Sequence, residues 1–328
     1  MKSMTRRRFV SAVGGLGLAA AAPALRAQAY PTKPIRLILG FAPGGLTDLL
    51  ARLVAPSMSE TLGQQVIVEN RAGANGNVGM AAVAAAEPDG HTLLFSSAAQ
   101  IVFSPNTYKT MPADPIRGLR HITMVAEGDF IIVVNAETGA KTVAQFAELA
   151  KSRPGKLNYG TAGAGGNTHV VLELFRRKLG VDVVPVHYRG TGAALPELLA
   201  NQVQLFAESQ PPIEAHLKSG KLNGLTVCGR KRLDAFPAIP TAAEVGIPEL
   251  ANISNWFGLH APKGTPDAVV ERLGVAIRTA ANGEAVKERI RAAGMSVVLN
   301  TPAEFMARIE SSNKVIGEVT RAANIQVE

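Results

Sequence analysis

Along the chain, segments with the hydrophobic period of a strand alternate with segments that have the period of a helix. The same order of segments occurs twice in the sequence. An apolar run at 35–39 leads through a Pro-Gly-Gly turn into a helical pattern over 47–62. About 120 residues later, the run at 156–159 leads through a Gly-rich turn into a helical pattern over 168–179. Each copy continues with a second strand, an Arg-Gly turn, a further helix and a third strand. Two such βαβαβ units predict an α/β protein of two lobes with parallel strands at their centres.

The remaining segments place the boundaries between these lobes. A β-branched run at 130–134 leaves the first unit, and a strand-like run at 253–259 follows the second. Three helical stretches close the chain, and their apolar stripes need a lobe to pack against. Because a return to the first lobe is the economical arrangement, we expect a first lobe of residues 30–131 plus 253–328, a second lobe of 132–252, and two interlobe crossings. The predicted fold class is α/β, with two lobes, two βαβαβ units and two interlobe crossings.

The first 29 residues carry an export signal. Three arginines at 6–8 precede an apolar stretch at 10–25 and the small-residue site Ala27-Gln28-Ala29, which is typical of a twin-arginine signal peptide cleaved before Tyr30. The full chain has a net charge of +8, but the segment holds five basic residues and no acidic one, which leaves +3. We therefore expect a periplasmic protein, and the basic pI gives no support to nucleic-acid binding.

The glycine-rich turns are the strongest candidates for a binding site. In each copy, glycines let the backbone approach a ligand, and the helix that follows offers unpaired N–H groups and a partial positive charge. Taken singly, each turn is as well explained by an ordinary strand-to-helix connection. The recurrence at equivalent places in both lobes favours an anion-binding cleft.

Other chemistries lack their motifs. The turn at 160–168 superficially suggests G-x-G-x-x-G, but Thr168 replaces the third glycine. His169 and Glu173 are one helical turn apart without a third metal ligand, and no Ser or Cys nucleophile stands in a known motif. We therefore expect no catalytic residue, no bound metal and no cofactor. His169 is interpreted as a polar group that faces the cleft or caps the loop, and Arg189 as either a carboxylate clamp or a surface residue.

The candidate ligand-binding residues come from the two turns, the helix starts and the ends of the third strands. They are Phe41, Ala42, Gly44, Gly45, Thr47, Asp48, Asn77, Ser96, Ser97, Thr161, Ala162, Ala164, Gly165, Asn167, Thr168, His169, Arg189 and Glu208.

Taken together, the motifs resemble those of the Bug family, the TctC-type solute-binding proteins of tripartite tricarboxylate transporters. The matching segments are 30–36 (YPTKPIR), 41–45 (FAPGG), 68–74 (VENRAGA), 88–94 (PDGHTLL), 154–159 (PGKLNY), 188–190 (YRG), 239–241 (IPT), 261–266 (APKGTP) and 301–305 (TPAEF). The resemblance implies the fold of a two-lobe, type II-like periplasmic binding protein, also called a flytrap. It implies that the loops 41–48 and 161–169 grip a small carboxylate (a di- or tricarboxylate, an aromatic acid or an amino acid) with backbone amides and ordered waters. It also implies docking onto a permease of large and small integral subunits.

One departure and two other function classes stay open. Many relatives carry Asp where this chain has Gln204, and often another Asp near Glu208, so amine-bearing ligands are less strongly implied. Instead of transport, the protein could present its ligand to a membrane sensor kinase, which the sequence does not separate from uptake. A periplasmic enzyme on the same scaffold would need a nucleophile–base pair that the sequence lacks. We expect a monomer.

Overall fold

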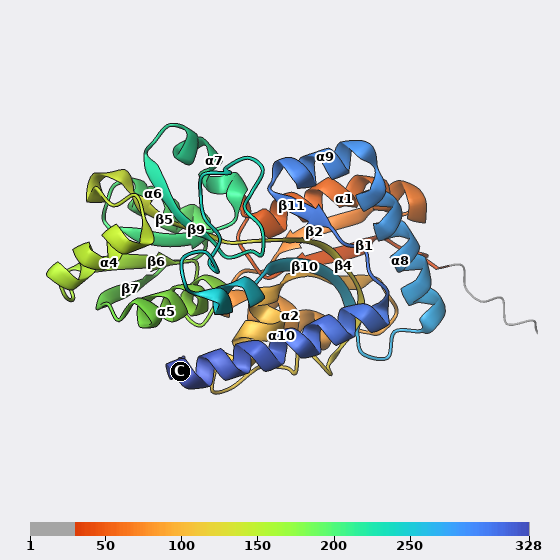
Figure 1. Ribbon diagram of the computed structural model, residues 1–328. Helices are drawn as coiled ribbons and strands as arrows, with labels where there is room; N and C mark the ends of the chain where they lie inside the picture. The colour runs from red at the N-terminus through yellow and green to blue at the C-terminus, as the bar shows by residue number, and fades with distance from the viewer. Residues whose placement is uncertain (1–29, 328) are drawn as a thin grey trace, which may run out of the picture.

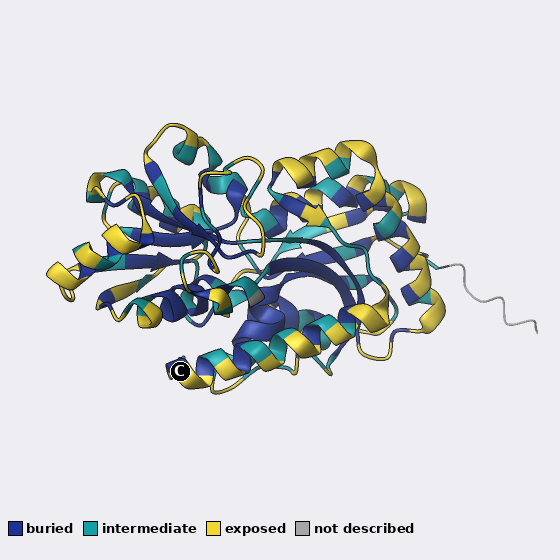
Figure 2. Ribbon diagram, in the orientation of Figure 1, coloured by how far each residue is buried: buried dark blue, intermediate teal, exposed yellow. Residues whose placement is uncertain are grey.

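The computed structural model describes residues 30–327 and consists of two lobes, each built around one β-sheet (Figure 1). The signal-peptide prediction for residues 1–29 lies outside the described residues. Helices cover the sheets, and the central strands of each sheet are buried almost throughout (Figure 2). The two-lobe α/β architecture expected from the repeat is confirmed.

Lobe 1 contains a six-stranded sheet in the order β11-β4-β10-β3-β1-β2. Its strands are β1 (Ile35–Leu39), β2 (Val66–Asn70), β3 (Thr92–Ser97), β4 (Leu119–Gly128), β10 (Asn255–Pro262) and β11 (Met295–Val297). Its helices are α1 (Leu46–Leu62), η1 (Ala74–Gly76), α2 (Asn77–Ala84), η2 (Ala99–Phe103), α3 (Ser104–Thr107), α8 (Asp267–Asn282), α9 (Glu284–Ala292) and α10 (Pro302–Ala323). β1 pairs in parallel with β2 and β3, as a βαβαβ unit requires.

Lobe 2 contains a five-stranded sheet in the order β7-β6-β8-β5-β9. Its strands are β5 (Ile131–Asn135), β6 (Leu157–Thr161), β7 (Val183–His187), β8 (Leu205–Glu208) and β9 (Leu222–Val227). Its helices are η3 (Ala136–Thr138), α4 (Val143–Ser152), α5 (Asn167–Leu179), α6 (Thr191–Leu199), α7 (Gln210–Lys218) and η4 (Pro248–Asn252). β6 pairs in parallel with β7 and β8, so the second unit repeats the strand order of the first.

Local sequence signals set many of these boundaries. α1 and α5 end at Gly63 and Gly180, whose left-handed φ angles of 72° and 60° suit a residue without Cβ. α10 begins with a capping box, in which Thr301 and Glu304 exchange hydrogen bonds between side chain and backbone.

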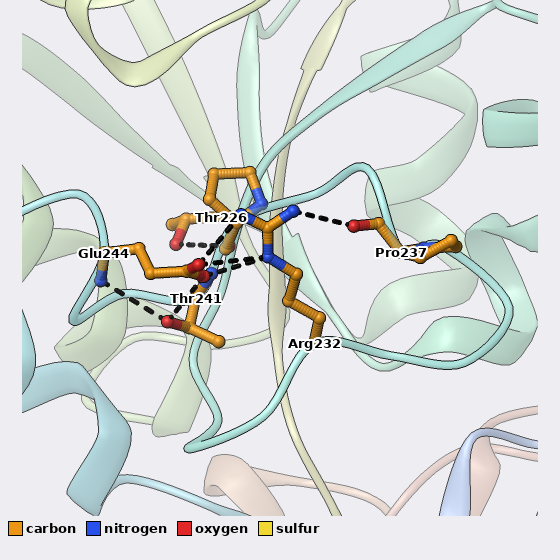
Figure 3. Close-up of polar contacts among 6 residues, drawn as sticks. Thr226, Arg232, Pro237, Thr241 and Glu244 are labelled. Carbon is orange, nitrogen blue, oxygen red and sulfur yellow. Dashed lines mark hydrogen bonds and ion pairs between the residues drawn. The ribbon is translucent and has the colours of Figure 1, made fainter.

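The chain passes between the lobes twice. The first crossing joins β4 to β5 through residues 129–130, and the second is the long connection from β9 to β10. An ion pair holds that connection together: the guanidinium of Arg232 binds Glu244 and donates to the Pro237 carbonyl at 2.8 Å (Figure 3). Residues 241–246 of this connection form a turn, in which the Val245 amide bonds to the Thr241 carbonyl and Gly246 has φ +83°.

The C-terminal helix α10 connects both lobes. It packs Phe305 and Ile309 into the core of lobe 1 and runs beneath the molecule to α5 of lobe 2 (Figure 1). There the guanidinium of Arg177 donates to the Ala322 carbonyl at 3.2 Å and to the carbonyl of Ala323. A cation at a helix C-terminus is favourable because the last carbonyls carry partial negative charge. Among residues 30–327, no helix has the length and apolar character needed to cross a bilayer.

Candidate binding site between the lobes

A cavity of about 400 Å³ lies between the two lobes. Its wall comes from both glycine-rich loops, the turn that begins α6, the ends of strands β3 and β8, the first crossing and the start of β10. The lining residues are Phe41, Ala42, Pro43, Gly45, Leu46, Thr47, Ser97, Ala99, Phe130, Asn167, Thr168, Arg189, Gly190, Thr191, Gly192, Ala193, Glu208, Asn255 and Phe257. The size is that of a site for a small molecule.

Three helices begin at this cavity. Their N-cap residues are Gly45 for α1, Gly166 for α5 and Gly190 for α6, and none of these has a side chain to cap its helix. In α1 the first intrahelical hydrogen bond runs from the Leu49 amide to the Gly45 carbonyl, so the amides of residues 46–48 precede it. In α5 the Asn167 side chain occupies one such amide, that of Thr168, at 2.8 Å. Three partially positive helix ends therefore surround one small volume, which favours an anionic occupant.

Two ionisable side chains belong to the cavity wall, Arg189 and Glu208. Arg189 adds a full positive charge to the three helix ends. Glu208 is 5% exposed; its carboxylate accepts a hydrogen bond from the Ser209 amide at 2.7 Å and another from the Thr191 hydroxyl. Burial raises the pKa of Glu208, and its hydrogen bonds to Thr191 and Ser209 offset part of that rise.

Asp48 shapes the loop at 41–48. Its carboxylate accepts hydrogen bonds from the Gly44 amide at 3.1 Å, from Asn70 Nδ2 at 3.0 Å and from Arg52 Nε at 3.0 Å. Burial raises the pKa of Asp48, but these hydrogen bonds outweigh burial and hold the pKa below its ordinary value. Asp48 thus holds the turn in place from outside the cavity lining, where it bonds with Arg52 and Asn70.

His169 shapes the loop at 161–169 in the same manner. Its Nδ1 accepts a hydrogen bond from the Gly165 amide at 3.0 Å, and the Thr168 hydroxyl accepts one from the Ala162 amide at 2.9 Å. Burial, reinforced by the neighbouring His187, lowers the pKa of His169 to about 4. A neutral imidazole is required here because only an unprotonated ring nitrogen can accept the amide hydrogen.

Lobe 1 contacts this second loop directly. The Thr107 hydroxyl donates to the Gly165 carbonyl at 2.8 Å, and the Tyr108 hydroxyl to the Ala164 carbonyl at 3.2 Å. In the cavity lining, Asn255 accepts from Asn167 at 3.2 Å and donates to Ser209 at 3.0 Å, so the start of β10 in lobe 1 bonds to two segments of lobe 2. The described conformation therefore has the lobes in contact on two sides of the cavity.

A buried chain of hydrogen bonds lies next to the lobe 1 wall. Ser96 Oγ is 2.6 Å from His260 Nε2, His260 Nδ1 is 2.7 Å from His121 Nδ1, and His121 Nε2 is 2.9 Å from the Ile116 carbonyl. That carbonyl can only accept, so His121 Nε2 donates, His260 Nδ1 donates to His121, and Ser96 donates to His260. The side chains of Ser96, His121 and His260 are at most 6% exposed. The chain therefore fixes the end of β3 beside the cavity and presents no nucleophile to it.

The structure brings part of the candidate list together at the cavity. The candidates that line it are Phe41, Ala42, Gly45, Thr47, Ser97, Asn167, Thr168, Arg189 and Glu208. The others, which lie outside the lining, are Gly44, Asp48, Asn77, Ser96, Thr161, Ala162, Ala164, Gly165 and His169. Most of these hold the loops or the strand ends in place, as Asp48, Ser96 and His169 do.

Sequence reasoning omitted several lining residues. Thr191 and its neighbours Gly190, Gly192 and Ala193 belong to an amide-rich turn at a helix start, the signal that selected the other two loops. Asn255 had no such signal, because its place depends on the crossing between lobes. The aromatic and aliphatic residues Pro43, Leu46, Ala99, Phe130 and Phe257 give the wall an apolar character that composition does not reveal. Within residues 30–327, no three His, Cys, Asp or Glu side chains are grouped to hold a metal ion.

Comparison with known proteins decides the family. Residues 50–325 match the model of the tripartite tricarboxylate transporter family receptor, TctC. The chain belongs to the TctC family. This TctC protein is similar to Protein BugT of Bordetella pertussis, with 34% identity over 301 residues, covering 91% of this chain and 92% of BugT.

Solved structures agree with that assignment. The periplasmic binding protein BugD shares 30% identity with a TM-score of 0.85, and R. palustris Rpa4515 with adipate shares 28% with a TM-score of 0.86. Each comparison covers 91% of this chain and all of the other. The resemblance seen in the sequence motifs is confirmed, and the protein is a solute-binding protein of the TctC/Bug type and not an enzyme.

Proposed function

We propose that this TctC protein captures a small carboxylate in the cavity between its lobes and delivers it to a tripartite tricarboxylate-type transporter. The observation that carries the proposal is the meeting of three helix N-termini, none capped by its N-cap side chain, and Arg189 around one cavity. The similar R. palustris protein is described with adipate, a carboxylate.

Capture follows from the geometry. A carboxylate in the cavity accepts hydrogen bonds from helix-start amides of both lobes at once, so it has more contacts when the lobes are together. A hydrogen bond to a charged group contributes about 1.5–3 kcal/mol. A few such contacts offset the cost of association and give about micromolar affinity, near −8 kcal/mol.

The proposal includes a cellular setting. The mature protein begins at Tyr30 after cleavage of a twin-arginine signal and works in the periplasm as a monomer. It consists of a first lobe (30–131 plus 253–328) and a second lobe (132–252), and its partner is a permease of large and small integral subunits. The candidate residues that line the cavity contact the ligand, and those outside it hold the loops.

A screen tests the binding step. Mature protein is mixed with di- and tricarboxylates, aromatic acids and amino acids, and melting is followed by thermal shift. A ligand that binds only the folded state raises the melting temperature, by mass action. Arg189→Gln should weaken the response and Arg230→Gln, outside the cavity, should leave it intact. A flat screen would contradict carboxylate capture. Uptake of the matching acid by a strain without the gene separates transport from ligand presentation to a sensor kinase.

A further inference from the structure

Glu208 gives the cavity an internal anion of its own. The carboxylate is buried in the wall, at the end of β8, and no Lys, Arg or His of the described residues is ion-paired with it. Its hydrogen-bond donors are the Thr191 hydroxyl and the Ser209 amide, one for each oxygen, together with the side chain of Ser209. An ionised carboxylate has about four acceptor positions. These donors therefore leave acceptor capacity on a buried carboxylate that has no ion pair.

The position of Glu208 divides the cavity. Thr191 is the first residue of α6, so the carboxylate of Glu208 is already bonded at that helix start. The first turn of α5 has no acidic residue, and Asp48 in the first turn of α1 lies outside the cavity lining and is ion-paired with Arg52. A ligand carboxylate is therefore directed to the amides of α1 and α5, and the other end of the ligand is left to meet Glu208.

Much of the remaining cavity wall is apolar. Phe41, Leu46, Phe130 and Phe257 contribute to the wall, which suits a short hydrocarbon segment. A hydrogen-bond donor at the far end of that segment would meet the free acceptor capacity of Glu208. A second carboxylate there would place two like charges together in a buried site, which is unfavourable.

We propose that Glu208 determines specificity by accepting a hydrogen bond from a hydroxyl or amine at the far end of the bound carboxylate, and that it rejects a second carboxylate there. The ligand is thus a hydroxy or amino acid with its donor separated from the carboxylate by a short chain. This inference rests on the proposed function. Burial without a paired cation raises the pKa of Glu208, and a ligand amine beside the carboxylate would lower that pKa again.

Two series of acids with matched chains test the proposal. The six-carbon series is hexanoate, 6-hydroxyhexanoate, 6-aminohexanoate and adipate, and the four-carbon series is butyrate, 4-hydroxybutyrate, 4-aminobutyrate and succinate. Affinities are measured by isothermal titration calorimetry at pH 7.5 for the wild type, Glu208→Gln and Glu214→Gln. Glu214 lies on α7 outside the cavity, so Glu214→Gln also removes one acidic charge and is the matched control. Circular dichroism checks the fold of each variant.

In at least one series, the wild type and Glu214→Gln should bind the hydroxy or amino acid about tenfold or more tightly than the methyl-ended acid and the diacid. Glu208→Gln should lose the preference for the amine and bind the diacid about tenfold more tightly, since the like charge is gone. Wild-type binding that ignores the end group, or favours the diacid in each series that binds, would overturn the Glu208 assignment and leave carboxylate capture standing. If Glu208→Gln does not fold, the wild-type ranking alone decides. No binding in either series overturns both this inference and the carboxylate site on which it rests.

Discussion

The hydroxyl of Thr107 in lobe 1 donates to the backbone carbonyl of Gly165 in lobe 2 at 2.8 Å. Thr107 is 1% exposed, and the amide of Val327, near the C-terminus, donates to its carbonyl at 2.7 Å. The loop that begins α5 is thereby bonded to a buried part of the opposite lobe. Because ligand capture needs the two lobes together, this hydrogen bond contributes to the binding-competent arrangement.

Thr107→Val should weaken carboxylate binding without unfolding the protein. Valine keeps the shape of threonine but loses the donor, and the Gly165 carbonyl loses its partner. A lost hydrogen bond of about 0.5–1.5 kcal/mol corresponds to an affinity two- to tenfold lower. Calorimetric titration of a ligand found in the thermal-shift screen measures it. Thr107→Ser keeps the hydroxyl and is the control. Equal affinities for the valine and serine variants would mean that the contact does not favour capture.

Gly45 and Gly165 should respond differently to a side chain. A Cβ on Gly45 would have the Ala42 carbonyl oxygen as its nearest neighbour, at 3.9 Å, whereas a Cβ on Gly165 would lie 2.7 Å from both Thr107 Oγ1 and Val327 Cγ2. Gly165 also has φ +69°, which L residues rarely adopt. We expect Gly45→Phe to fold and to block the cavity, and Gly165→Phe to lower the melting temperature as well.

Titration calorimetry and thermal melting of both variants check this expectation. Gly283→Phe, at an exposed position with φ −59° far from the cavity, is the control for adding a ring. If Gly45→Phe binds ligand with wild-type affinity, the α1 loop is not part of the site. A melting temperature of Gly165→Phe equal to the wild type would contradict the tight interlobe packing.

The repeated βαβαβ pattern predicted the two lobes because its signals are local. Apolar strands, helix periods and the glycines that end α1 and α5 are all readable from neighbouring residues. The C-terminal helices illustrate the limit of such signals. Their apolar stripes predicted packing on lobe 1, but the contact between Arg177 and the end of α10 joins residues about 145 positions apart. No periodicity within either helix encodes that contact.

For the candidate site, too, local sequence signals predicted some features and not others. The pattern that marked the loop at 161–169 could not say whether His169 points into the cavity or back at its own loop, because that depends on where Gly165 is held. Ser96 and Ser97 end one strand, and alternation along a strand sends neighbours to opposite faces. Ser97 lines the cavity and Ser96 bonds His260, a residue 164 positions away. Choosing between two adjacent serines requires the register against β10.

Asp48→Ala should destabilise the protein and weaken ligand binding together. The substitution leaves the Gly44 amide and Asn70 Nδ2 without the carboxylate that accepts from both. The turn before α1 therefore loses the hydrogen bonds that hold its conformation. A lost acceptor for such groups costs about 1–3 kcal/mol of unfolding free energy. Urea denaturation and ligand titration measure the two effects. Glu60→Ala, an exposed acidic residue near the other end of α1, is the control. A variant that loses stability but binds normally would show that the turn needs no support from Asp48.

The paired histidines beside the cavity should make stability depend on pH. Burial lowers the pKa of His121 and, together with the adjacent His121 ring, that of His260, so both stay neutral in the folded protein. The groups facing them are Ser96, the Ile116 carbonyl and the ring of Phe305, and Asp114 opposes the shift of His121 only in part. Unfolded histidine takes up a proton below about pH 6.5. The contribution of these two neutral histidines to the free energy of unfolding is therefore fully present above that pH and is lost as the pH falls below it.

The variant His121→Gln shows how much of this pH dependence of stability comes from His121. Glutamine can donate to the Ile116 carbonyl and accept from His260, so it reproduces the neutral imidazole without titrating. Between pH 6.5 and 5, each histidine kept neutral steepens the loss of unfolding free energy by up to about 1.4 kcal/mol per pH unit. Urea denaturation across this range should therefore give a shallower slope for His121→Gln than for the wild type. His216→Gln, on α7 of lobe 2, removes an imidazole outside the pair and should keep the wild-type slope. Because His169 and His187 are present in all three proteins, their contribution cancels in the comparison, and equal slopes would mean that His121 is protonated in the folded state.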